Sequence, residues 1–463
     1  MLFRSGAIVA ANGGDFTADA SATGSIEALG VSAAVSAAVG SGQASLSGAG
    51  TGVDVANSIA NTVEAGLLGG SSVDTAGAAS IGATDSAGIV ANAVAAAGSI
   101  GASGSTVSVS LAVAVALAEN TIDNTVRAAV DDSALAALGA VSISADGSKS
   151  IDATVVSATI SMSLGTGTLS LSGAVGVASA TNTIGGSGRA EILDADAADG
   201  QSVTAGGPLT LFADNTSQIR AELVSAAVSV SVSTGTVAIS FSAAVALAKN
   251  TLTQETFAGI DNSVVAVSGG GVDAQALSNS TIDAITVAAA ISISGSTGSA
   301  GFSGSAAVAV AENEIGGSTE ALIANGSDVN ASGTVALFVD DSATINSDVV
   351  AASISVGAST NVAGSLSVAV TLSQNTLTGN ARAAIDDSVV VSQAGDIDVA
   401  ANSMKSIGAV GVAAAFSLSG SGKIALSGAG SGVDARNILS NSVAAEIVNS
   451  TATAGGAVSV TAD

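Results

Sequence analysis

Apolar and polar side chains alternate with a period of two along most of this chain. Val228, Val230 and Val232 alternate with serines, and the alternation resumes after a Thr-Gly-Thr turn at 234–236. Side chains of a strand point alternately to the two faces of a sheet, so the pattern predicts strands with one large apolar face and one face of Ala, Ser and Gly. The same pattern returns at 107–117 and 169–177, and helices of any length find no support.

Glycine-containing pairs separate the alternating segments. We expect turns at Asp146-Gly147, Gly206-Gly207, Asn325-Gly326 and Gly455-Gly456. Short segments such as Val-Ser-Ile-Ser-Ala, which begins at Val141, are expected to be short strands that open each unit.

Two residues recur at a nearly constant interval, which reveals an internal repeat. An Ile after a polar segment and an Asn that closes an alternating segment each occur seven times, spaced by 62 or 63 residues apart from one interval of 68. The isoleucines are Ile26, Ile89, Ile151, Ile219, Ile282, Ile345 and Ile407. The asparagines are Asn57, Asn120, Asn182, Asn250, Asn313, Asn375 and Asn437. Both series keep one phase, so we take them as structural anchors of seven repeats.

These anchors predict the division of the chain. The expected units are a lead-in at 1–13, repeats at 14–77, 78–139, 140–207, 208–270, 271–333, 334–395 and 396–456, and the start of an eighth unit at 457–463. The long interval places an insertion after Asn182, around 185–207, where Asp194, Asp196 and Asp199 cluster. We expect this insertion to protrude as a loop.

A unit of about 62 residues made of strands cannot bury its apolar face alone, and stacking of successive units would bury that face. The pattern therefore predicts an all-β fold, a parallel β-solenoid (right-handed β-helix) with two or three coils per repeat. Three coils give a rod of roughly 100 Å and two coils give roughly 70 Å at the ~4.8 Å spacing between strands.

The face of small residues has two interpretations. Ala, Ser and Gly either face solvent or fill a narrow core, or they allow close lateral approach of another rod. The recurrent Asn suggests a ladder of stacked amides, but with several coils per repeat the copies would lie roughly 10 to 14 Å apart, beyond hydrogen bonding. We therefore expect these Asn residues to occupy turns.

Composition narrows the possible functions. The net charge is -27, only 10% of residues are charged, and the chain contains no His or Cys. It therefore lacks imidazole bases, thiolate nucleophiles, Cys/His zinc sites and disulfides. Its ten Lys and Arg residues are scattered singly, so we expect no nucleic-acid partner. No segment reaches the ~18 consecutive apolar residues of a spanning helix, so we expect the chain not to span a membrane.

Adjacent carboxylates are the main candidates for chemistry. They occur at Asp131-Asp132, Asp340-Asp341 and Asp386-Asp387, and Asp131 and Asp386 fall at matching turns. Paired acids can cleave glycosides, but neighbours on a strand point to opposite faces, so we predict no catalytic residue, no cofactor and no enzyme. Two alternatives stay open: calcium binding at Asp131, Asp132, Asp386 and Asp387, and a β-helix enzyme that degrades polysaccharides with Asp131 and Asp132.

The repeat units resemble those of a known class of proteins. Val-Ser-Ile-Ser-Ala-Asp-Gly-Ser-Lys-Ser-Ile (141–151) and Ala-Thr-Asn-Thr-Ile (180–184) resemble the repeat regions of large bacterial exoproteins, the filamentous-haemagglutinin-like and autotransporter-passenger adhesins. The resemblance covers nearly the whole chain as a style of repeat. It implies a secreted or cell-surface right-handed β-helix used as a stalk, adhesin or matrix fibre. The secretion and translocator regions of that class are not in this sequence, which leaves the export route open.

We therefore expect a structural, extracellular protein of the bacterial cell surface. Its partner is another copy of itself, in surface or matrix filaments built by end-to-end stacking, with lateral packing as an additional mode. The alternative is an adhesin that binds cell-surface or matrix glycans through the loop at 185–207. Residues 1–12 are too short for a secretory signal. The chain closes on Thr-Ala-Asp, as its first unit does at 17–19, so we expect either a longer array or a head-to-tail contact between ends.

Overall fold

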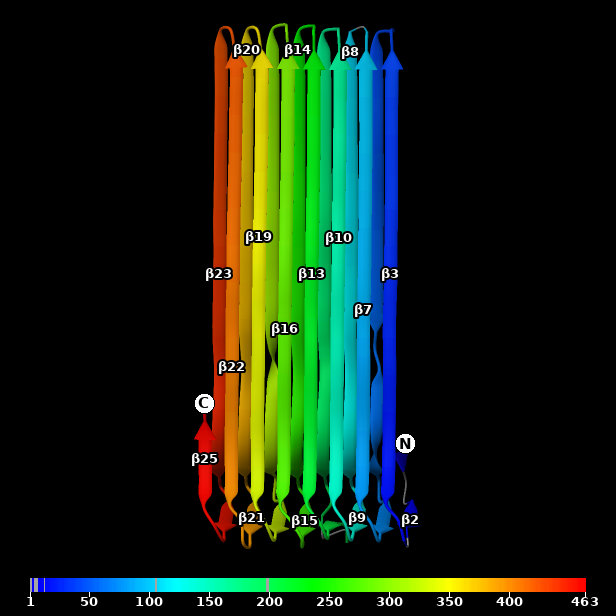
Figure 1. The fold of residues 1–463 in the computed structure, drawn as a ribbon, viewed down its shortest axis with the longest axis vertical. Helices are drawn as coiled ribbons and strands as arrows, with labels where there is room; N and C mark the ends of the chain where they lie inside the picture. The colour runs from blue at the N-terminus through cyan, green and yellow to red at the C-terminus, as the bar shows by residue number, and fades with distance from the viewer. Residues whose placement is uncertain (1, 4–6, 12, 105, 197–199) are drawn as a thin grey trace.

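The protein is a parallel β-solenoid in the computed structural model, which describes residues 2–3, 7–11, 13–104, 106–196 and 200–463. Each repeat forms one coil. A long strand runs up to a tight turn at the tip, a second long strand runs down, and a short strand closes the coil (Figure 1). Equivalent strands of successive coils pair in parallel and build three sheets.

The front sheet, which faces the viewer in Figure 1, carries the first long strand of each coil. It consists of β3 (Phe16–Gly40), β7 (Ala79–Ser103), β10 (Val141–Gly165), β13 (Leu209–Ser233), β16 (Val272–Ser296), β19 (Val335–Ser359), β22 (Ile397–Ser421) and β25 (Val458–Ala462).

The back sheet lies behind it and carries the second long strand. It consists of β1 (Leu2–Phe3), β4 (Ala44–Ile59), β5 (Thr62–Leu68), β8 (Val107–Asp131), β11 (Leu169–Leu193), β14 (Val237–Asp261), β17 (Ala300–Ala324), β20 (Val362–Asp386) and β23 (Ile424–Val448).

The base sheet is made of the short closing strands. These are β2 (Ile8–Ala11), β6 (Ser72–Thr75), β9 (Ala134–Ala137), β12 (Val203–Ala205), β15 (Val264–Val267), β18 (Asp328–Ala331), β21 (Val389–Ser392) and β24 (Thr451–Ala454).

The parallel solenoid is confirmed, but the expectation of two or three coils per repeat is wrong. Ile151 of β10 pairs directly with Ile89 of β7 and with Ile219 of β13, so neighbouring strands are one whole repeat apart. The polar pair Asp146-Gly147 looks like a turn in the sequence but lies inside β10, in extended backbone. When such polar positions are taken as turns, each long strand is counted as several short strands, and the number of coils per repeat is overestimated.

The coil count changes the expected shape. A strand of 25 residues is about 80 Å long, and eight strands stack to only about 34 Å, by the usual rise and strand spacing. The molecule is therefore a slab whose long axis runs along the strands, and both predicted rod lengths are wrong (Figure 1).

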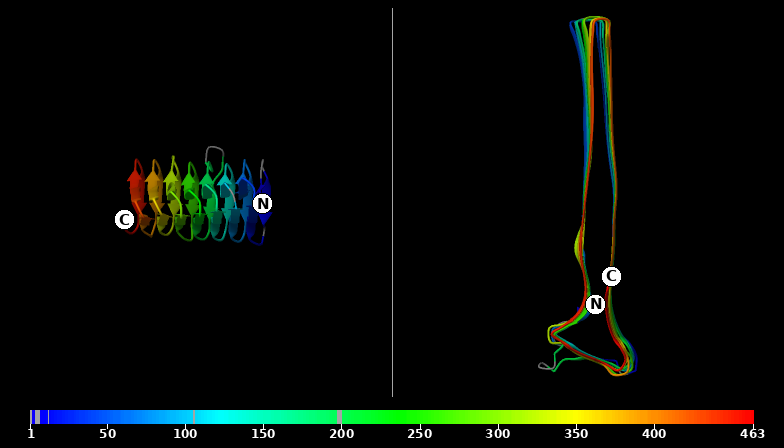
Figure 2. Two further views of the ribbon diagram at one scale, coloured as in Figure 1. Left: turned by 90° about the horizontal axis from the view of Figure 1, so that it is seen from above. Right: turned by 90° about the vertical axis from the view of Figure 1, so that its left-hand side faces the viewer.

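At one end the three sheets enclose a triangular core, the base (Figure 2). Its inward side chains are apolar, and many are large, such as Ile143, Ile192, Leu209 and Leu211, all of them buried. Three sheets meeting at angles leave a wide interior, and close packing requires large side chains to fill it.

Beyond the base only the front and back sheets face each other, and this thin region is the blade (Figure 2). Most of its inward residues are small: Ala93 and Ala95 of β7 face the interior with Ala112 and Ala114 of β8, and all four are buried. A methyl group placed on Gly176 would lie 3.0 Å from the Ser225 hydroxyl oxygen and 3.2 Å from that of Ser157, from strands of the opposite sheet. Near the base this interior still holds larger side chains such as Ile151 and Leu223. Toward the tip the two sheets approach so closely that mainly Ala, Ser and Gly fit between them.

The expectation that stacking buries the large apolar face is wrong for the blade. Ser229 and Ser231 are fully buried, whereas Val232 is 39% exposed and Phe241 is 47% exposed. Of the two interpretations of the small face, filling a narrow core is the one that holds. Lateral approach of another molecule through that face is ruled out for the described residues, because the opposite sheet already covers it.

Many serine hydroxyls inside the blade form hydrogen bonds that bridge the two sheets. Ser161 donates to the Ser110 carbonyl oxygen at 2.9 Å, and Ser231 donates to that of Ser170 at 2.8 Å. Such bonds avoid the cost of burying an unpaired hydroxyl and hold the two sheets in register.

Candidate assembly surfaces

The recurrent Asn residues form a ladder, and the expectation that they occupy turns is wrong. Each lies inside a back-sheet strand and points into the interior, and the Nδ2 of each donates to the Oδ1 of the next at 2.8 Å. The ladder joins Asn57, Asn120, Asn182, Asn250, Asn313, Asn375 and Asn437. One coil per repeat places the copies one strand spacing apart, which is what a stacked amide requires.

The ladder has a direction. Asn57 donates to Asn120 at one edge of the slab, and Asn375 donates to Asn437 at the other. The order of donor and acceptor never reverses, so the first coil presents the Oδ1 of Asn57 outward and the last coil presents the Nδ2 of Asn437. The two edges are therefore complementary.

The isoleucine anchors also stack. Ile26, Ile89, Ile151, Ile219, Ile282, Ile345 and Ile407 pair in one row of the front sheet. The five central members are buried. They lie within long strands and not, as the sequence had suggested, directly after a turn.

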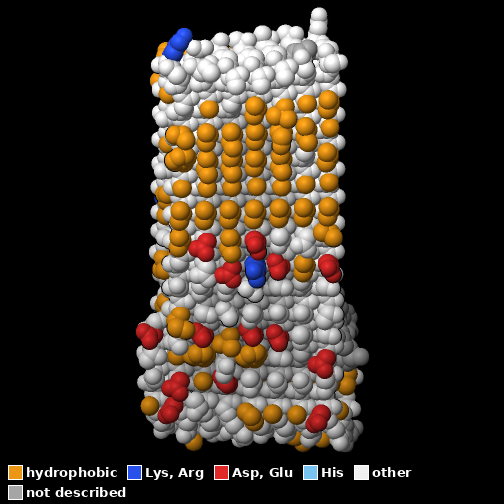
Figure 3. All heavy atoms as spheres, turned by 45° about the horizontal axis from the view of Figure 1, so that its top comes forward, with side chains coloured by type: hydrophobic (Ala, Val, Ile, Leu, Met, Phe, Trp, Pro, Cys, Tyr) orange, Lys and Arg blue, Asp and Glu red, His pale blue; other side chains and the backbone are white. Residues whose placement is uncertain are grey.

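The outer side of the front sheet carries five rows of apolar side chains above a charged band (Figure 3). The first two rows are uniform. One is Val31, Val94, Val156, Val224, Val287, Val350 and Val412, and the next is Ala33, Ala96, Ala158, Ala226, Ala289, Ala352 and Ala414.

The three further rows are mixed but equally apolar. They contain Val35, Gly98, Ile160, Val228, Ile291, Ile354 and Phe416; then Ala37, Ile100, Met162, Val230, Ile293, Val356 and Leu418; then Val39, Ala102, Leu164, Val232, Gly295, Ala358 and Gly420. We call the five rows together the front apolar face. Every one of its positions is Gly or apolar.

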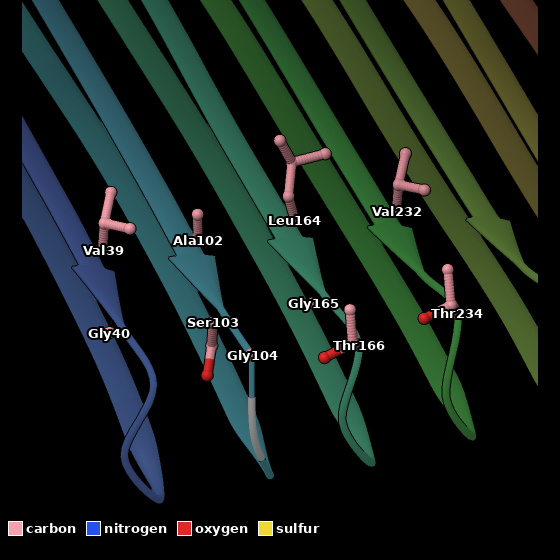
Figure 4. A pocket seen from close by; sticks show the side chains of 10 residues that line it. All are labelled: Val39, Gly40, Ala102, Ser103, Gly104, Leu164, Gly165, Thr166, Val232 and Thr234. Atoms are coloured by element: carbon pink, nitrogen blue, oxygen red, sulfur yellow. The ribbon is translucent and has the colours of Figure 1, made fainter.

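A shallow hollow of about 340 Å³ interrupts the front apolar face near the tip. It lies where Ala102 stands between the longer side chains of Val39 and Leu164, beside Val232 (Figure 4). The hollow is apolar and open. It results from the unequal lengths of neighbouring side chains and is part of the front apolar face.

The outer side of the back sheet is also apolar along the blade but has a different relief. One of its rows alternates glycine with a large residue: Gly48, Leu111, Gly173, Phe241, Gly304, Leu366 and Gly428. Phe241 lies against Gly304, since a Cβ on that glycine would sit 3.4 Å from the ring. The large side chains thus fill the gaps left by their own neighbours.

The acidic pairs are distributed between turns and strands. Asp132 and Asp387 have positive φ values of 46° and 47°, which confirms turns at these positions. Asp340 and Asp341 lie inside β19, where the first points outward and the second inward. The turns at Asp132 and Asp387 follow strands that end at the base, and they lie in different coils. The structure therefore does not bring these two acidic pairs together.

The carboxylates next to these turns bind arginine. Arg127 contacts Asp131 at 2.6 Å, Glu191 at 2.6 Å and Glu64 at 2.9 Å, while Arg382 contacts Asp386 at 2.9 Å. Burial opposes the charge of Arg127, but its bonds to Asp131 and Glu191 outweigh that effect and raise the pKa of the guanidinium. Gln201 donates to Asp132 at 2.8 Å. Within the described ranges, no group of three acidic side chains is arranged to hold a metal ion. Asp131 and Asp386 instead pair with an arginine four residues earlier in the same strand.

A layer of buried polar residues, the polar belt, separates the base core from the blade. Lys405 forms a 2.8 Å ion pair with Asp341, and both side chains are at least nine-tenths buried. Lys149 is 2% exposed, and its Nζ lies 3.4 Å from Asn215 Oδ1. Burial lowers the pKa of Lys149 to about 8, against an opposing effect of Asp85 and Asp123.

The polar belt was missed in the sequence, where these lysines pass for isolated surface cations. A signal does exist. Lys149 and Lys405 each stand two residues before an anchor, Ile151 or Ile407, and therefore share the inward phase of that anchor.

The insertion is shorter than predicted. Leu193 still pairs with Asp131 and Val203 already pairs with Leu135, so the extra residues lie between Leu193 and Val203 at a corner of the base. Asn262 donates to Asp194 at 2.7 Å and ties the start of this segment to the next coil. Asp199 lies outside the described residues.

Comparison with protein-family models, with curated proteins and with solved structures finds no match for this chain. In the part of the chain that the structure describes, no helix has the length and apolarity needed to cross a membrane.

Proposed function

We propose that this protein is a structural element that builds filaments by stacking its solenoid end to end. The observation that carries the proposal is the complementarity of the two edges. Coils repeat in one register with a continuous Asn ladder, so the edge at Asn437 offers the donor that the edge at Asn57 accepts. A head-to-tail contact of this kind is heterologous and grows without closing.

The main chain supports the same contact. The Ile424 N–H donates to Asn361 of the previous coil at 2.8 Å, so even-numbered residues of β23 bond backward and odd-numbered ones direct their N–H groups outward. In the described residues β23 pairs only with β20. An uncovered edge strand of this length is a template for another parallel strand.

The resemblance to repeat regions of large bacterial exoproteins supports an extracellular or cell-surface place for such a filament. Low charge, the absence of Cys and a repetitive fold suit a secreted structural protein. The filament we propose is a ribbon about 80 Å wide, because its width is the length of a strand.

Electron microscopy of the purified protein tests this proposal. We expect ribbons that lengthen with protein concentration, and shorter ones from Ser431→Pro, which removes an outward N–H from β23. Ser431→Ala keeps that N–H and should leave the ribbons unchanged. A monodisperse single slab at every concentration would contradict the proposal.

An adhesin is the second candidate, favoured by the extra residues at the corner between Leu193 and Val203. An interruption of an otherwise uniform base is where a specific contact would be sited. Removal of residues 195–201 should then abolish binding to cells or glycans, and undiminished binding would count against this function.

A further inference from the structure

We infer that the front apolar face binds the same face of a second copy of this chain, so that two slabs pair laterally with their strands antiparallel. This deepens the proposed filament, because it defines how ribbons thicken. The thickening of ribbons rests on the proposed filament, but lateral pairing does not, since two single chains can pair without stacking end to end.

The size of the face supports a stable pair. Seven strands and five rows cover an area of about 34 Å by 30 Å, roughly 1,000 Å² per copy, by the usual strand spacing and rise. The largest apolar patch on a typical monomer covers only about 300–600 Å². A standard protein interface buries about 800 Å² per partner. The front apolar face is therefore larger than the usual apolar patch of a monomer and as large as one side of a standard interface.

The relief of the face is self-complementary. The alanine row through Ala226 forms a groove that crosses all seven long strands, between a ridge of valines and a ridge of branched residues that includes Ile160 and Ile354. A ridge from a second copy fits this groove, as in dry interdigitated sheets. Ile160 is 54% exposed in the single chain, so pairing would remove much apolar area from water.

The charges beside the face decide the orientation. Five carboxylates and one guanidinium form the charged band at the base side of the face: Glu27, Asp152, Glu222, Asp283, Asp348 and Arg220. Pairing with both bases at the same end would place two acidic bands opposite each other, which is repulsive. The base is also wider than the blade, so it would wedge the copies apart (Figure 2). With the strands antiparallel, each charged band clears the tip of the other copy.

A second copy suits the face better than a lipid surface does. Among the described residues, the outermost long strands β3 and β23 pair with a neighbour on one side only. The main-chain groups of their outer sides would be costly in hydrocarbon. In a pair these edges stay open to water or to the next slab of the ribbon. The back sheet is the weaker candidate, since its large side chains already fill the gaps beside them.

Charges placed in the valine row provide the first test. Val156→Lys, Val224→Lys and Val287→Lys combined should weaken pairing by roughly 100-fold or more, because pairing would then remove three ammonium groups from water. The measurement is the mass in solution by sedimentation equilibrium, with circular dichroism to verify the fold.

The matched control is Val177→Lys, Val245→Lys and Val308→Lys, which adds the same charge to a valine row of the back sheet and should leave the pair intact. Loss of pairing only in the control would overturn the inference, as would a single-chain mass for the unmodified protein.

Cross-linking provides the second test, because the chain contains no Cys. Val228 lies in the middle row of the central strand, so antiparallel pairing brings it close to Val228 of the second copy. Val228→Cys should form a disulfide-linked pair under mild oxidation, and Val245→Cys on the back sheet should not. A pair that persists while Val228→Cys stays unlinked would disprove the proposed geometry.

Two further outcomes separate this inference from the proposed function. Paired slabs without ribbons would support the inference and refute filament growth, whereas ribbons one slab thick would do the reverse. Flotation of single chains with phosphatidylcholine vesicles, without pairs, would show that lipid covers the face and would overturn the inference.

Discussion

The base and the blade use the same alternation along the same strands, but large and small side chains exchange sides. In β10, Ile143 points inward in the base and is buried, whereas Ile160 points outward in the blade and is 54% exposed. The inward phase does not change between them. What changes is the distance between the sheets, which is wide where three sheets meet and narrow where two sheets face each other.

The comparison shows that a period of two identifies two faces without saying which one is buried. In the base, apolar burial follows the ordinary rule that large apolar residues fill the interior. In the outer part of the blade, close approach of the sheets selects residues by size, and the large apolar residues there are left outside. An exposed apolar surface is thus a geometric consequence of the thin interior.

The polar belt is the boundary between the two regions, and breaking it should have the largest effect. Lys405→Met leaves the Asp341 carboxylate buried without its partner, which typically costs about 3–5 kcal/mol. Urea unfolding followed by circular dichroism measures this loss. The exposed Lys423 at the tip is the control, and Lys423→Met should change stability by less than about 0.5 kcal/mol. Equal unfolding midpoints for the two variants would show that the ion pair contributes nothing.

The inside-to-outside exchange along β10 predicts unequal costs for the same truncation. Ile143→Ala removes packing from the base core and should destabilise the protein by about 2–5 kcal/mol. Ile160→Ala removes an outward side chain from the blade and should cost less than about 1 kcal/mol in the unpaired protein. The comparison is made at low protein concentration, and a reversed order would refute the assignment of the two faces.

Lys149 makes the stability of the boundary depend on pH. Its pKa is about 8 in the folded chain against 10.5 ordinarily, so between these values the unfolded chain holds a proton that the folded chain has lost. The free energy of unfolding therefore rises with pH between these two pKa values, by at most about 3 kcal/mol. Below pH 8 the contribution of Lys149 does not change with pH.

The variant Lys149→Met should remove this rise and increase stability at pH 7. The chain has no His, Cys or Tyr, which leaves the window free of their titrations. Unfolding midpoints from pH 7 to 11 test the prediction, and a rise that persists in the variant would assign it to another group.

Overpacking should be felt in the blade interior and hardly at all outside it. Ala178→Leu inserts three carbon atoms between the sheets and should cost about 1–3 kcal/mol. Ala158→Leu adds the same atoms to an outward position and should lie within about 0.5 kcal/mol of the unmodified protein. If both substitutions are tolerated equally, the sheets are further apart than the neighbours of Gly176 indicate.

Much of the fold was predictable because the repeat is strict. The seven isoleucines and seven asparagines marked equivalent positions, and equivalent positions in a solenoid stack. The number of coils was not predictable from the same pattern, since Asp146-Gly147 has the composition of a turn but lies within β10. The wrong coil count also led to the rejection of the Asn ladder, because a ladder forms only if successive copies lie one strand spacing apart.

The candidate surface was predictable in part. The alternation pointed to a large apolar face and a small one, and Asp131 and Asp386 were assigned to matching turns. The buried lysines of the polar belt were not recognised, because nothing but their phase relative to Ile151 and Ile407 separates them from surface cations.

The amino-acid pattern alone settles that the chain forms strands, that they repeat about every 62 residues and that they stack in parallel. Those features follow from local alternation and from periodicity, which any segment carries within itself. Which face is inside depends on the distance to a sheet formed by residues elsewhere in the coil. That distance is a property of three sheets closing in the base and two sheets meeting in the blade. For this reason the large apolar side chains near the tip of the blade lie outside, and small side chains fill the space within.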